Sequence, residues 1–524
     1  MALTKAHFRM ISGQSFNVKD YGAAGDGVAD DTASIQAAID AADAAGGGTV
    51  YFPSGDYKTD SQVTLCSDLE MRGDMNAKLL PSDTVPTQAY YAESKSNIRI
   101  NDLVIEGTGT ANTSGLQRLV QFQGCSEVQI HNCTFRKARE SAIVADNCDQ
   151  GRMSECIVEQ CHVYGFEVRN NCVSWVISDC IFYQNGNTGT ASTAFGRGIV
   201  IWQSTRINVT NCTFKDQTEY GLRLYSQSGD AYSNQQIAIS NCTFENNGTT
   251  ATSKVDLYIY NEATTIETVT ISNCTFRTRA SNIAISVQGN GVAVTNCSLE
   301  AASTGTGLAF GFYAASNSVV SNCVVRGFDN CLSLSPSAIP DQVSVINCQF
   351  IDCGALANDI YGDHTVISNC YFKQTATAKA ANVTAISATT AGIVGTKIIN
   401  NTFDNCYRAV EINIDNAEVE VSGNTCLNTG DLTVRCYGTD LTNLIFYGNK
   451  LDLGTNPVIL GKIQRMGGFY PMTIGKSNTA PTDFTFAVGD MVFNQGATAG
   501  GKAGWICTTA GTPGTWKPFG AIDA

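Results

Sequence analysis

A short Asn-Cys pattern recurs through most of the chain and constrains the fold more than any other feature. Four copies read Asn-Cys-Thr-Phe, ending at positions 135, 214, 244 and 276, and looser copies continue as far as Leu451. The spacing of its cysteines runs from 22 residues, between Cys348 and Cys370, to 32 residues, between Cys180 and Cys212. A repeat of this length predicts a solenoid, in which each copy contacts only its neighbours.

Each copy alternates apolar and polar residues. In the first clear copy, Val128, Ile130, Cys133 and Phe135 face one way if the chain bends near Asn132. This alternation is typical of β-strands, and Asn tolerates the left-handed backbone that such a bend requires. A single strand cannot bury its apolar side, but stacked copies can. We therefore predict an all-β fold, a right-handed single-stranded parallel β-helix of roughly a dozen rungs about 4.8 Å apart.

The cysteines favour a row of buried, reduced thiols. The chain has 21 of them, an odd number, and most fall one to a rung. A disulfide framework is not expected in a chain that is long enough to build a core. No Cys-x-x-Cys pair with a matching His or Cys set appears, so we expect no metal and no cofactor.

Composition excludes several classes of protein. The formal net charge of −14 argues against a nucleic-acid partner. No apolar run approaches the roughly 20 residues that span a bilayer, so no membrane partner is expected. The first residues do not resemble a signal peptide, which predicts a soluble protein made in a cytoplasm.

Three segments are predicted. Residues 1–18 form an N-terminal leader, residues 19–460 form the parallel β-helix with its N-terminal cap, and residues 466–524 form a small C-terminal β module. The cap contains an amphipathic helix, within residues 34–45, that we expect to close the first rung. Trp505 and Trp516 suit either a cap or trimer-forming unit, or a sugar-binding surface.

A resemblance to a known superfamily rests on residues 20–55. Asp20–Ala23, Asp26–Thr32 and Gly47–Gly55 are similar to the N-terminal signature of the pectate-lyase-like β-helix superfamily, which includes polygalacturonases and phage tailspike depolymerases. The leader resembles the start of phage tail proteins. The tailspike resemblance implies a virion tail protein that acts at the bacterial cell surface, and a homotrimer. It does not fix the chemistry, because the superfamily contains hydrolases, lyases and non-enzymes.

A second strand in each rung carries the candidate site. We align these strands on the inward pairs Phe166/Val168, Ile199/Ile201, Leu222/Leu224 and Leu257/Ile259. Period-two alternation then sends a set of charged and aromatic residues to the outer face: Glu167, Arg169, Trp202, Arg223, Tyr225, Asp256, Tyr258 and Tyr260. Aromatic rings beside charged groups favour a carbohydrate groove over a merely solvated face. The predicted substrate-binding residues are Arg169, Trp202, Arg223, Tyr225, Tyr258 and Tyr260.

Hydrolysis of a glycosidic bond requires two carboxylates, roughly 5.5 Å apart in retaining enzymes and roughly 6.5–9.5 Å apart in inverting ones. Glu167 is the first choice for the acid, because burial would raise its pKa. The other catalytic candidates are Asp256, Glu219 and Asp230, followed by Asp146 and Glu140. Each could instead form an ion pair with a nearby arginine.

A lyase needs a base and a group that neutralises a uronate carboxylate. His162 with Tyr164, or Arg223 with Tyr225, could supply these roles, although His162 also suits an ordinary turn. The sequence thus predicts a tailspike-like polysaccharide depolymerase, with a glycoside hydrolase slightly favoured over a lyase. A non-catalytic receptor-binding or structural tail protein is the alternative.

Overall fold

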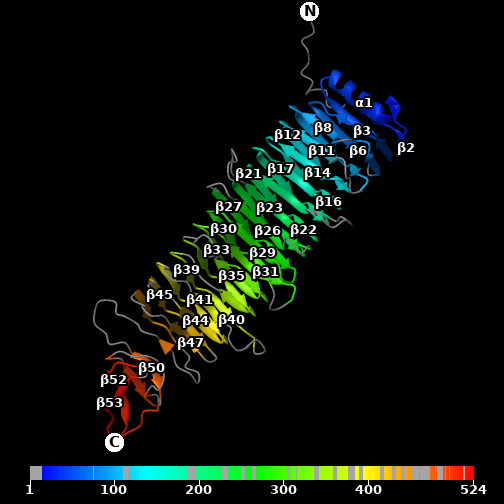
Figure 1. Cartoon of the computed structure of the whole chain (residues 1–524). Helices are drawn as coiled ribbons and strands as arrows, with labels where there is room; N and C mark the ends of the chain where they lie inside the picture. Colours follow the sequence, from blue (N-terminus) through cyan, green and yellow to red (C-terminus); the bar gives the residue numbers. More distant parts are fainter. Residues whose placement is uncertain are drawn as a thin grey trace, which may run out of the picture. The chain divides into compact units, whose positions relative to one another are not determined.

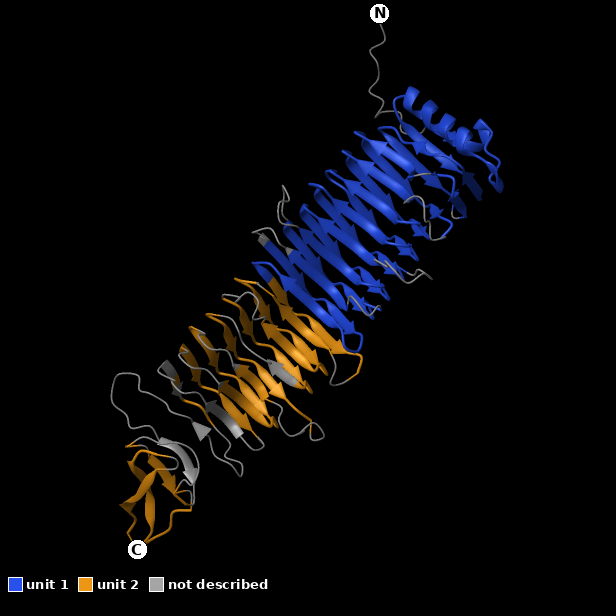
Figure 2. Ribbon diagram, viewed as in Figure 1, with its two compact units in different colours: residues 1–292 blue, residues 293–524 orange. Residues whose placement is uncertain are grey.

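The predicted fold class is confirmed: the chain is a right-handed parallel β-helix (Figure 1). The computed structural model describes residues 14–74, 76–85, 87–109, 117–186, 196–226, 234–249, 254–261, 267–303, 307–313, 315–334, 342–357, 363–375, 384–388, 394–413, 418–427, 432–437, 443–450, 459–460, 473–477, 479–480, 488–489, 491–494, 496–511 and 514–523. It contains two compact units, Met1–Val292 and Ala293–Ala524 (Figure 2).

Unit 1 contains the 3-10 helix η2 (Val18–Tyr21), helix α1 (Thr32–Ala44) and three parallel sheets. Sheet A contains β1 (Ser15–Asn17), β3 (Gly48–Phe52), β6 (Leu69–Gly73), β9 (Ser96–Asn101), β12 (Ser126–His131), β15 (Arg152–Ser154), β18 (Val173–Ser178), β21 (Thr205–Thr210), β24 (Gln235–Ser240) and β27 (Glu267–Ser272). Sheet B contains β2 (Asp26–Asp30), β4 (Gly55–Thr59), β7 (Ala77–Pro81), β10 (Val104–Glu106), β13 (Thr134–Arg136), β16 (Ile157–Glu159), β19 (Ile181–Tyr183), β22 (Thr213–Lys215), β25 (Thr243–Glu245) and β28 (Thr275–Thr278). Sheet C contains β5 (Val63–Thr64), β8 (Gln88–Glu93), β11 (Arg118–Gln123), β14 (Ser141–Asp146), β17 (Tyr164–Arg169), β20 (Arg197–Trp202), β23 (Tyr220–Ser226), β26 (Val255–Asn261) and β29 (Ile283–Gln288).

Unit 2 repeats this winding. One wall of unit 2 holds β30 (Val292–Thr295), β33 (Val319–Ser321), β36 (Ser344–Ile346), β39 (Val366–Ser368), β42 (Thr396–Ile399), β45 (Glu418–Ser422) and β48 (Asn443–Tyr447). The second wall holds β31 (Ser298–Ala301), β34 (Val324–Arg326), β37 (Gln349–Ile351), β40 (Tyr371–Lys373), β43 (Thr402–Asp404) and β46 (Thr425–Leu427). The third wall holds β32 (Leu308–Phe312), β35 (Asn330–Leu334) and β38 (Ala355–Ala357), and then sheet E, with β41 (Thr384–Ala388), β44 (Arg408–Asn413), β47 (Leu432–Tyr437) and β49 (Ile459–Leu460).

Helix α1 packs against the first strands of unit 1, as the amphipathic pattern predicts. Ile35, Ala38, Ile39 and Ala42 are buried, and the helix contacts β1, β3, β5 and β6. The carboxylate of Asp31, at the start of the helix, accepts hydrogen bonds from the backbone N–H groups of Ala24, at 2.6 Å, and Gly25, at 3.0 Å. Asp31 therefore connects the loop that contains Ala24 and Gly25 to the start of α1.

Both ends of the predicted β-helix segment carry further strands. Strand β1 lies inside the predicted leader and pairs with β3, while residues 1–13 lie outside the described residues. Near the C-terminus, β50 (Thr473–Ser477), β51 (Met491–Asn494), β52 (Lys502–Thr509) and β53 (Thr515–Ala521) form a four-stranded sheet with both parallel and antiparallel pairs. No described helix is long and apolar enough to cross a bilayer.

The Asn bend is confirmed at Asn132, Asn211, Asn241 and Asn273, whose φ angles lie between 50° and 55°. The Asn132 amide donates a hydrogen bond of 2.7 Å to the Asp102 carboxylate of the preceding rung. An ionised carboxylate only accepts hydrogen bonds, whereas an Asn side chain at the same place would also carry N–H groups that need acceptors.

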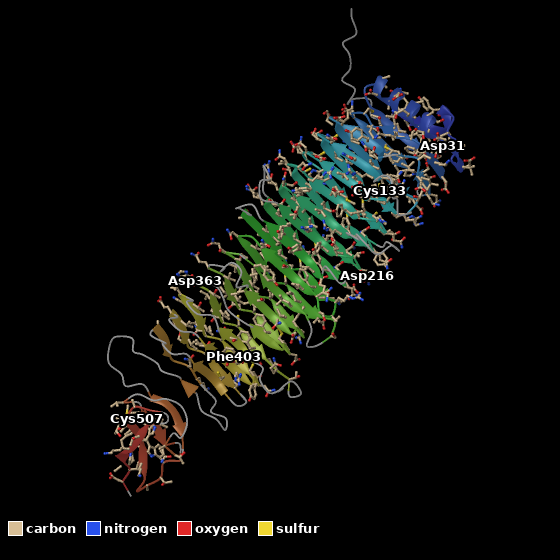
Figure 3. The ribbon with its side chains drawn as sticks, viewed as in Figure 1. Asp31, Cys133, Asp216, Asp363, Phe403 and Cys507 are labelled. Atoms are coloured by element: carbon tan, nitrogen blue, oxygen red, sulfur yellow. A yellow bond between two sulfur atoms is a disulfide. The ribbon has the colours of Figure 1, made fainter. Side chains whose placement is uncertain are left out.

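The core consists of side chains stacked in register from rung to rung. Phe182, Phe214, Phe244 and Phe276 stack with ring centroids 4.7–5.2 Å apart, close to the spacing of paired strands. In unit 2, the Phe372 ring lies 5.0 Å from Phe350 and 4.9 Å from Phe403. Figure 3 labels Cys133 and Phe403 among the side chains of the two units.

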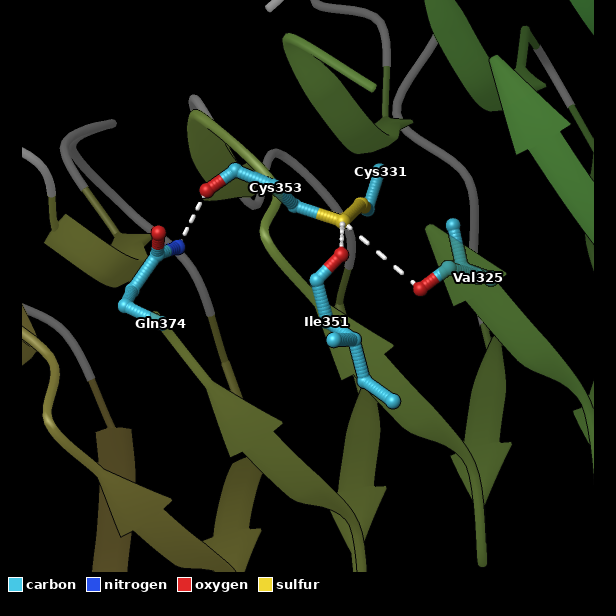
Figure 4. The surroundings of a disulfide bond; sticks show 5 residues. All are labelled: Val325, Cys331, Ile351, Cys353 and Gln374. Atoms are coloured by element: carbon cyan, nitrogen blue, oxygen red, sulfur yellow. Dashed lines mark hydrogen bonds between the residues drawn. A yellow bond between two sulfur atoms is a disulfide. The ribbon is translucent and has the colours of Figure 1, made fainter. Parts of the chain in front are cut away.

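The prediction of reduced thiols is wrong at one place. Cys331 and Cys353 form a disulfide between consecutive rungs, beside the carbonyl groups of Val325 and Ile351 (Figure 4). The other cysteines whose side chains are described are free and buried. Burial raises the pKa of Cys161, which disfavours the reactive thiolate.

We predict that the phenylalanine stack carries a large share of the stability of unit 2. Replacing Phe372, buried between two rings, by Ala should lower the free energy of unfolding by about 3–5 kcal/mol. Leu427→Ala, at a side chain that is 38% exposed in the same sheet, should change it by no more than about 0.5 kcal/mol. Urea denaturation followed by circular dichroism measures both free energies of unfolding. Equal losses in the two variants would contradict a stabilising role of the phenylalanine stack.

Candidate functional site

The predicted alignment of the site strands is confirmed by the register of sheet C. Phe166, Ile199, Leu222 and Leu257 are successive partners on β17, β20, β23 and β26, and all are buried. The next residue along each strand faces outward, and these residues are Glu167, Val200, Arg223 and Tyr258. Two residues further along, the outward residues include Trp202, Tyr225 and Tyr260. Residues far apart in the sequence thus share one outer face.

Arg223 lies among four tyrosines, which we call the tyrosine cage. The centre of its guanidinium is 4.0 Å from the ring centroid of Tyr225, 5.5 Å from Tyr258, 5.6 Å from Tyr220 and 6.0 Å from Tyr260. These distances are in the range of cation–π attraction. The rings also contact one another, and the Trp202 ring adjoins Tyr225 at 5.5 Å.

The Arg223 cation has no carboxylate partner among the described residues. Arg118, Arg169 and Arg197, on the same face, each bind a carboxylate within 3.0 Å. The Nε–H of Arg223 is buried and has no acceptor in the described part of the chain. Burial, reinforced by nearby Arg197, lowers the pKa of Arg223, although a guanidinium remains charged at neutral pH. The cage therefore holds a cation suited to an external anion.

Glu167 is buried, and its two carboxylate oxygens have different partners. The Ser141 hydroxyl donates to Oε1, and Arg169 Nη1 donates to Oε2 at 3.0 Å. Burial raises the pKa of Glu167, as expected from the sequence, and Arg169 opposes that shift. Arg169 Nε also donates to Asp146 at 3.0 Å, so one guanidinium joins two carboxylates.

Glu219 is held in a separate ion pair. Arg197 Nε donates to its carboxylate at 2.9 Å, and Arg197 Nη1 donates to the Tyr164 hydroxyl at 3.2 Å. Glu219 and Glu167 lie two strands apart across sheet C and four residues apart along it. At about 4.8 Å per strand and about 3.3 Å per residue, their Cα atoms are roughly 16 Å apart.

The predicted outward position of Asp256 is wrong. Its side chain is fully buried, accepting hydrogen bonds from the Asn247 amide at 2.9 Å and the Thr278 hydroxyl at 2.7 Å. Burial raises the pKa of Asp256 to about 7. A buried interior group cannot contact a polysaccharide on the outer face, so Asp256 is not retained in the site.

The reason is a break in alternation at the start of these strands. Gly198 and Gly221 precede the inward residues by one position, yet a Cβ at either would lie 2.7 Å from the core rings of Phe214 and Phe244. This position therefore faces the interior, and Asp256 occupies the same position one rung further on. The residue before it faces outward, which explains why Tyr220 joins the cage unpredicted.

The remaining candidates have different outcomes. Asp230 lies outside the described residues. His162 lies in the turn before β17, where burial lowers its pKa. Glu140 binds Arg118 at 2.9 Å. In the described part of the chain, no group of three or more His, Cys, Asp or Glu side chains is placed to hold a metal ion.

Comparison with known proteins agrees with the fold. Residues 15–223 match the family described as rhamnogalacturonase A/epimerase, pectate lyase-like, which confirms the predicted resemblance to that superfamily. Mannuronan C5-epimerase AlgE2 of Azotobacter vinelandii is 34% identical over 190 residues, 33% of this chain and 17% of the epimerase. Alginate lyase 7 of the same organism is 72% identical over 43 residues, 8% of this chain and 5% of the lyase. The chain thus spans less than a fifth of either relative.

Solved structures also align with the chain, at low sequence identity. The exopolygalacturonase of Thermotoga maritima is 13% identical, with a TM-score of 0.48 over 69% of this chain and 92% of that one. Tailspike protein 3 of bacteriophage CBA120 is 12% identical, with a TM-score of 0.43 over 97% of this chain and 69% of the tailspike.

The burial of Asp256 predicts a specific dependence of stability on pH. Its pKa is about 7 in the folded chain and about 3.9 when unfolded, so wild-type stability from this group is complete below about pH 4 and lost as pH rises to about 7. Asp256→Asn removes the titration and keeps both hydrogen-bond partners. Its stability relative to wild type should therefore increase by up to about 4 kcal/mol between pH 4 and pH 7, and then stay constant. Urea unfolding at pH 4.5, 6 and 8 measures this, and parallel pH profiles would contradict it.

Proposed function

We propose that the outer face of sheet C, from β14 to β26, is the active site of an enzyme that modifies an acidic polysaccharide. The observation that carries this proposal is Arg223, a cation surrounded by tyrosine rings and without a carboxylate partner among the described residues. A uronate carboxylate would supply the missing charge, and guanidinium groups bind carboxylates through paired hydrogen bonds. The neighbouring rings offer flat apolar surfaces to the faces of the sugar.

The partial relatives support the same class of substrate. Their names specify mannuronan and alginate, which are polymers of uronate sugars. Both names describe chemistry on a polysaccharide chain. The share of each relative that is matched is small, so the extension to this chain rests on the Arg223 site.

The cage favours cleavage by β-elimination. Binding to Arg223 would offset the negative charge of the uronate carboxylate and so make the C5 proton of the sugar more acidic. Tyr225, the ring nearest to Arg223, would act in its phenolate form as the base that accepts this proton as the C4–C5 double bond forms. The C4–O bond breaks, its electron pair goes to the leaving oxygen, and a second tyrosine of the cage protonates that oxygen.

Hydrolysis is the second candidate, and Arg169 is the observation that favours it. Glu167 and Asp146 bind the same guanidinium, each at 3.0 Å, which holds two carboxylates near one another as a hydrolase pair requires. The raised pKa of Glu167 suits an acid. In this alternative Glu167 protonates the leaving oxygen, and Asp146 acts as nucleophile or base.

We also propose a place in the virion for this enzyme. The leader and the N-terminal signature support a phage tailspike that acts at the bacterial surface as a homotrimer. Size-exclusion chromatography with light scattering tests the trimer.

Wild-type protein incubated with alginate or polygalacturonate should release products with the ultraviolet absorbance of unsaturated uronates. Arg223→Ala should lower the initial rate at least 100-fold, because it removes the group that stabilises the developing charge. Arg206→Ala, an exposed arginine on sheet A, is the matched control and should retain the wild-type rate.

The products decide between the alternatives. New reducing ends without that absorbance, abolished by Glu167→Gln, would replace the lyase with a hydrolase. Turnover of neutral polysaccharides alone would contradict the acidic substrate. Binding without turnover of any polysaccharide would identify a receptor-binding protein instead.

A further inference from the structure

Sheet E of unit 2 repeats part of the chemistry of sheet C. In sheet C, Ser141 opens β14 and Glu167 is the fourth residue of β17, the next strand. In sheet E, Thr384 opens β41 and Glu411 is the fourth residue of β44. The registers agree, since Ser141 pairs with the first residue of β17 and Thr384 with the first residue of β44.

The contacts are repeated as well. The Ser141 hydroxyl donates to the Glu167 carboxylate, and the Thr384 hydroxyl donates to Glu411 Oε2 at 3.0 Å. Each glutamate is buried, with 5% of Glu167 and 8% of Glu411 exposed. An arginine of the same strand binds each one, Arg169 at 3.0 Å and Arg408 at 3.3 Å.

The protein does not use all of the hydrogen-bonding capacity of Arg408. Its bond to Glu411 is long, and its Nε–H is buried without an acceptor among the described residues, as is that of Arg223. The Arg408 side chain remains 14% exposed, and its guanidinium lies 5.4 Å from the Tyr407 ring. Ser387, the register partner of Glu411, adds a hydroxyl to the same face.

We propose that the face formed by Thr384, Ser387, Tyr407, Arg408 and Glu411 is a second saccharide-binding site. Its ligand is a segment of the acidic polysaccharide, an assignment that rests on the proposed function. Arg408 would bind a sugar carboxylate or hydroxyl, Glu411 and the hydroxyl groups would bind the rim of the ring, and Tyr407 would contact its face. The role assigned to this site is to hold the chain, and cleavage is assigned to sheet C.

A second contact on the same polymer strengthens retention. Once one segment is bound, another segment reaches the second site at a high effective concentration. Long chains should therefore be retained more strongly than short ones.

The test compares retention with turnover in the full-length protein. Electrophoresis in gels containing alginate or polygalacturonate measures retention, and the rate on a uronate trisaccharide measures turnover. Arg408→Ala should weaken retention about tenfold or more, the loss expected for hydrogen bonds to a charged group, and leave the trisaccharide rate unchanged. Lys397→Ala, which removes an exposed cation from β42 of the same unit, should change neither. Arg408→Lys, which keeps the charge, should recover part of the retention.

The outcomes separate this inference from the proposed function. Two results would overturn the second site and leave the proposed enzymatic function standing. One is retention that depends on Arg223 and not on Arg408, and the other is an equal loss of retention in Lys397→Ala and Arg408→Ala. Loss of retention in Arg408→Ala in a protein that forms no unsaturated product would support the second site and overturn the lyase. If wild-type protein is retained by neither alginate nor polygalacturonate, the second site is also overturned.

Discussion

The hydrogen-bonded register between parallel strands is the constraint on which the rest of this structure depends. It fixes a spacing of about 4.8 Å between equivalent residues of successive rungs, which is also a suitable distance for stacking rings. The phenylalanines inside and the tyrosines outside both follow this spacing. A one-residue slip of any strand would exchange the buried and exposed sides, so the core also fixes the placement of the site.

The same constraint explains what the sequence could predict. The Asn-Cys repeat identifies the rungs, and aligning the inward aliphatic residues correctly places Glu167 beside Arg169 and Arg223 beside Tyr225 and Tyr258. Period-two alternation fails at the first residues of the sheet C strands, where the chain turns and a glycine position faces the phenylalanine stack. Asp256 was misplaced and Tyr220 was missed for that single reason. The disulfide between Cys331 and Cys353 was missed because one cysteine per rung does not reveal which pairs approach.

The charges on sheet C are arranged unevenly, and this unevenness carries the functional argument. Three arginines of the face bind carboxylates of neighbouring rungs, which lowers the cost of burying both charges. Arg223 is instead surrounded by aromatic rings, which attract a cation but do not neutralise it. The ion pairs hold the surface in place, and we propose that Arg223 binds an anionic ligand.

A crystal structure with a bound uronate trisaccharide tests this assignment most directly. Glu167→Gln in the hydrolase case, or a tyrosine variant of the cage in the lyase case, would keep the ligand intact. We predict a sugar carboxylate within about 3 Å of the Arg223 guanidinium, with a sugar ring against the tyrosine cage. A trisaccharide bound with its carboxylates away from Arg223 would contradict it.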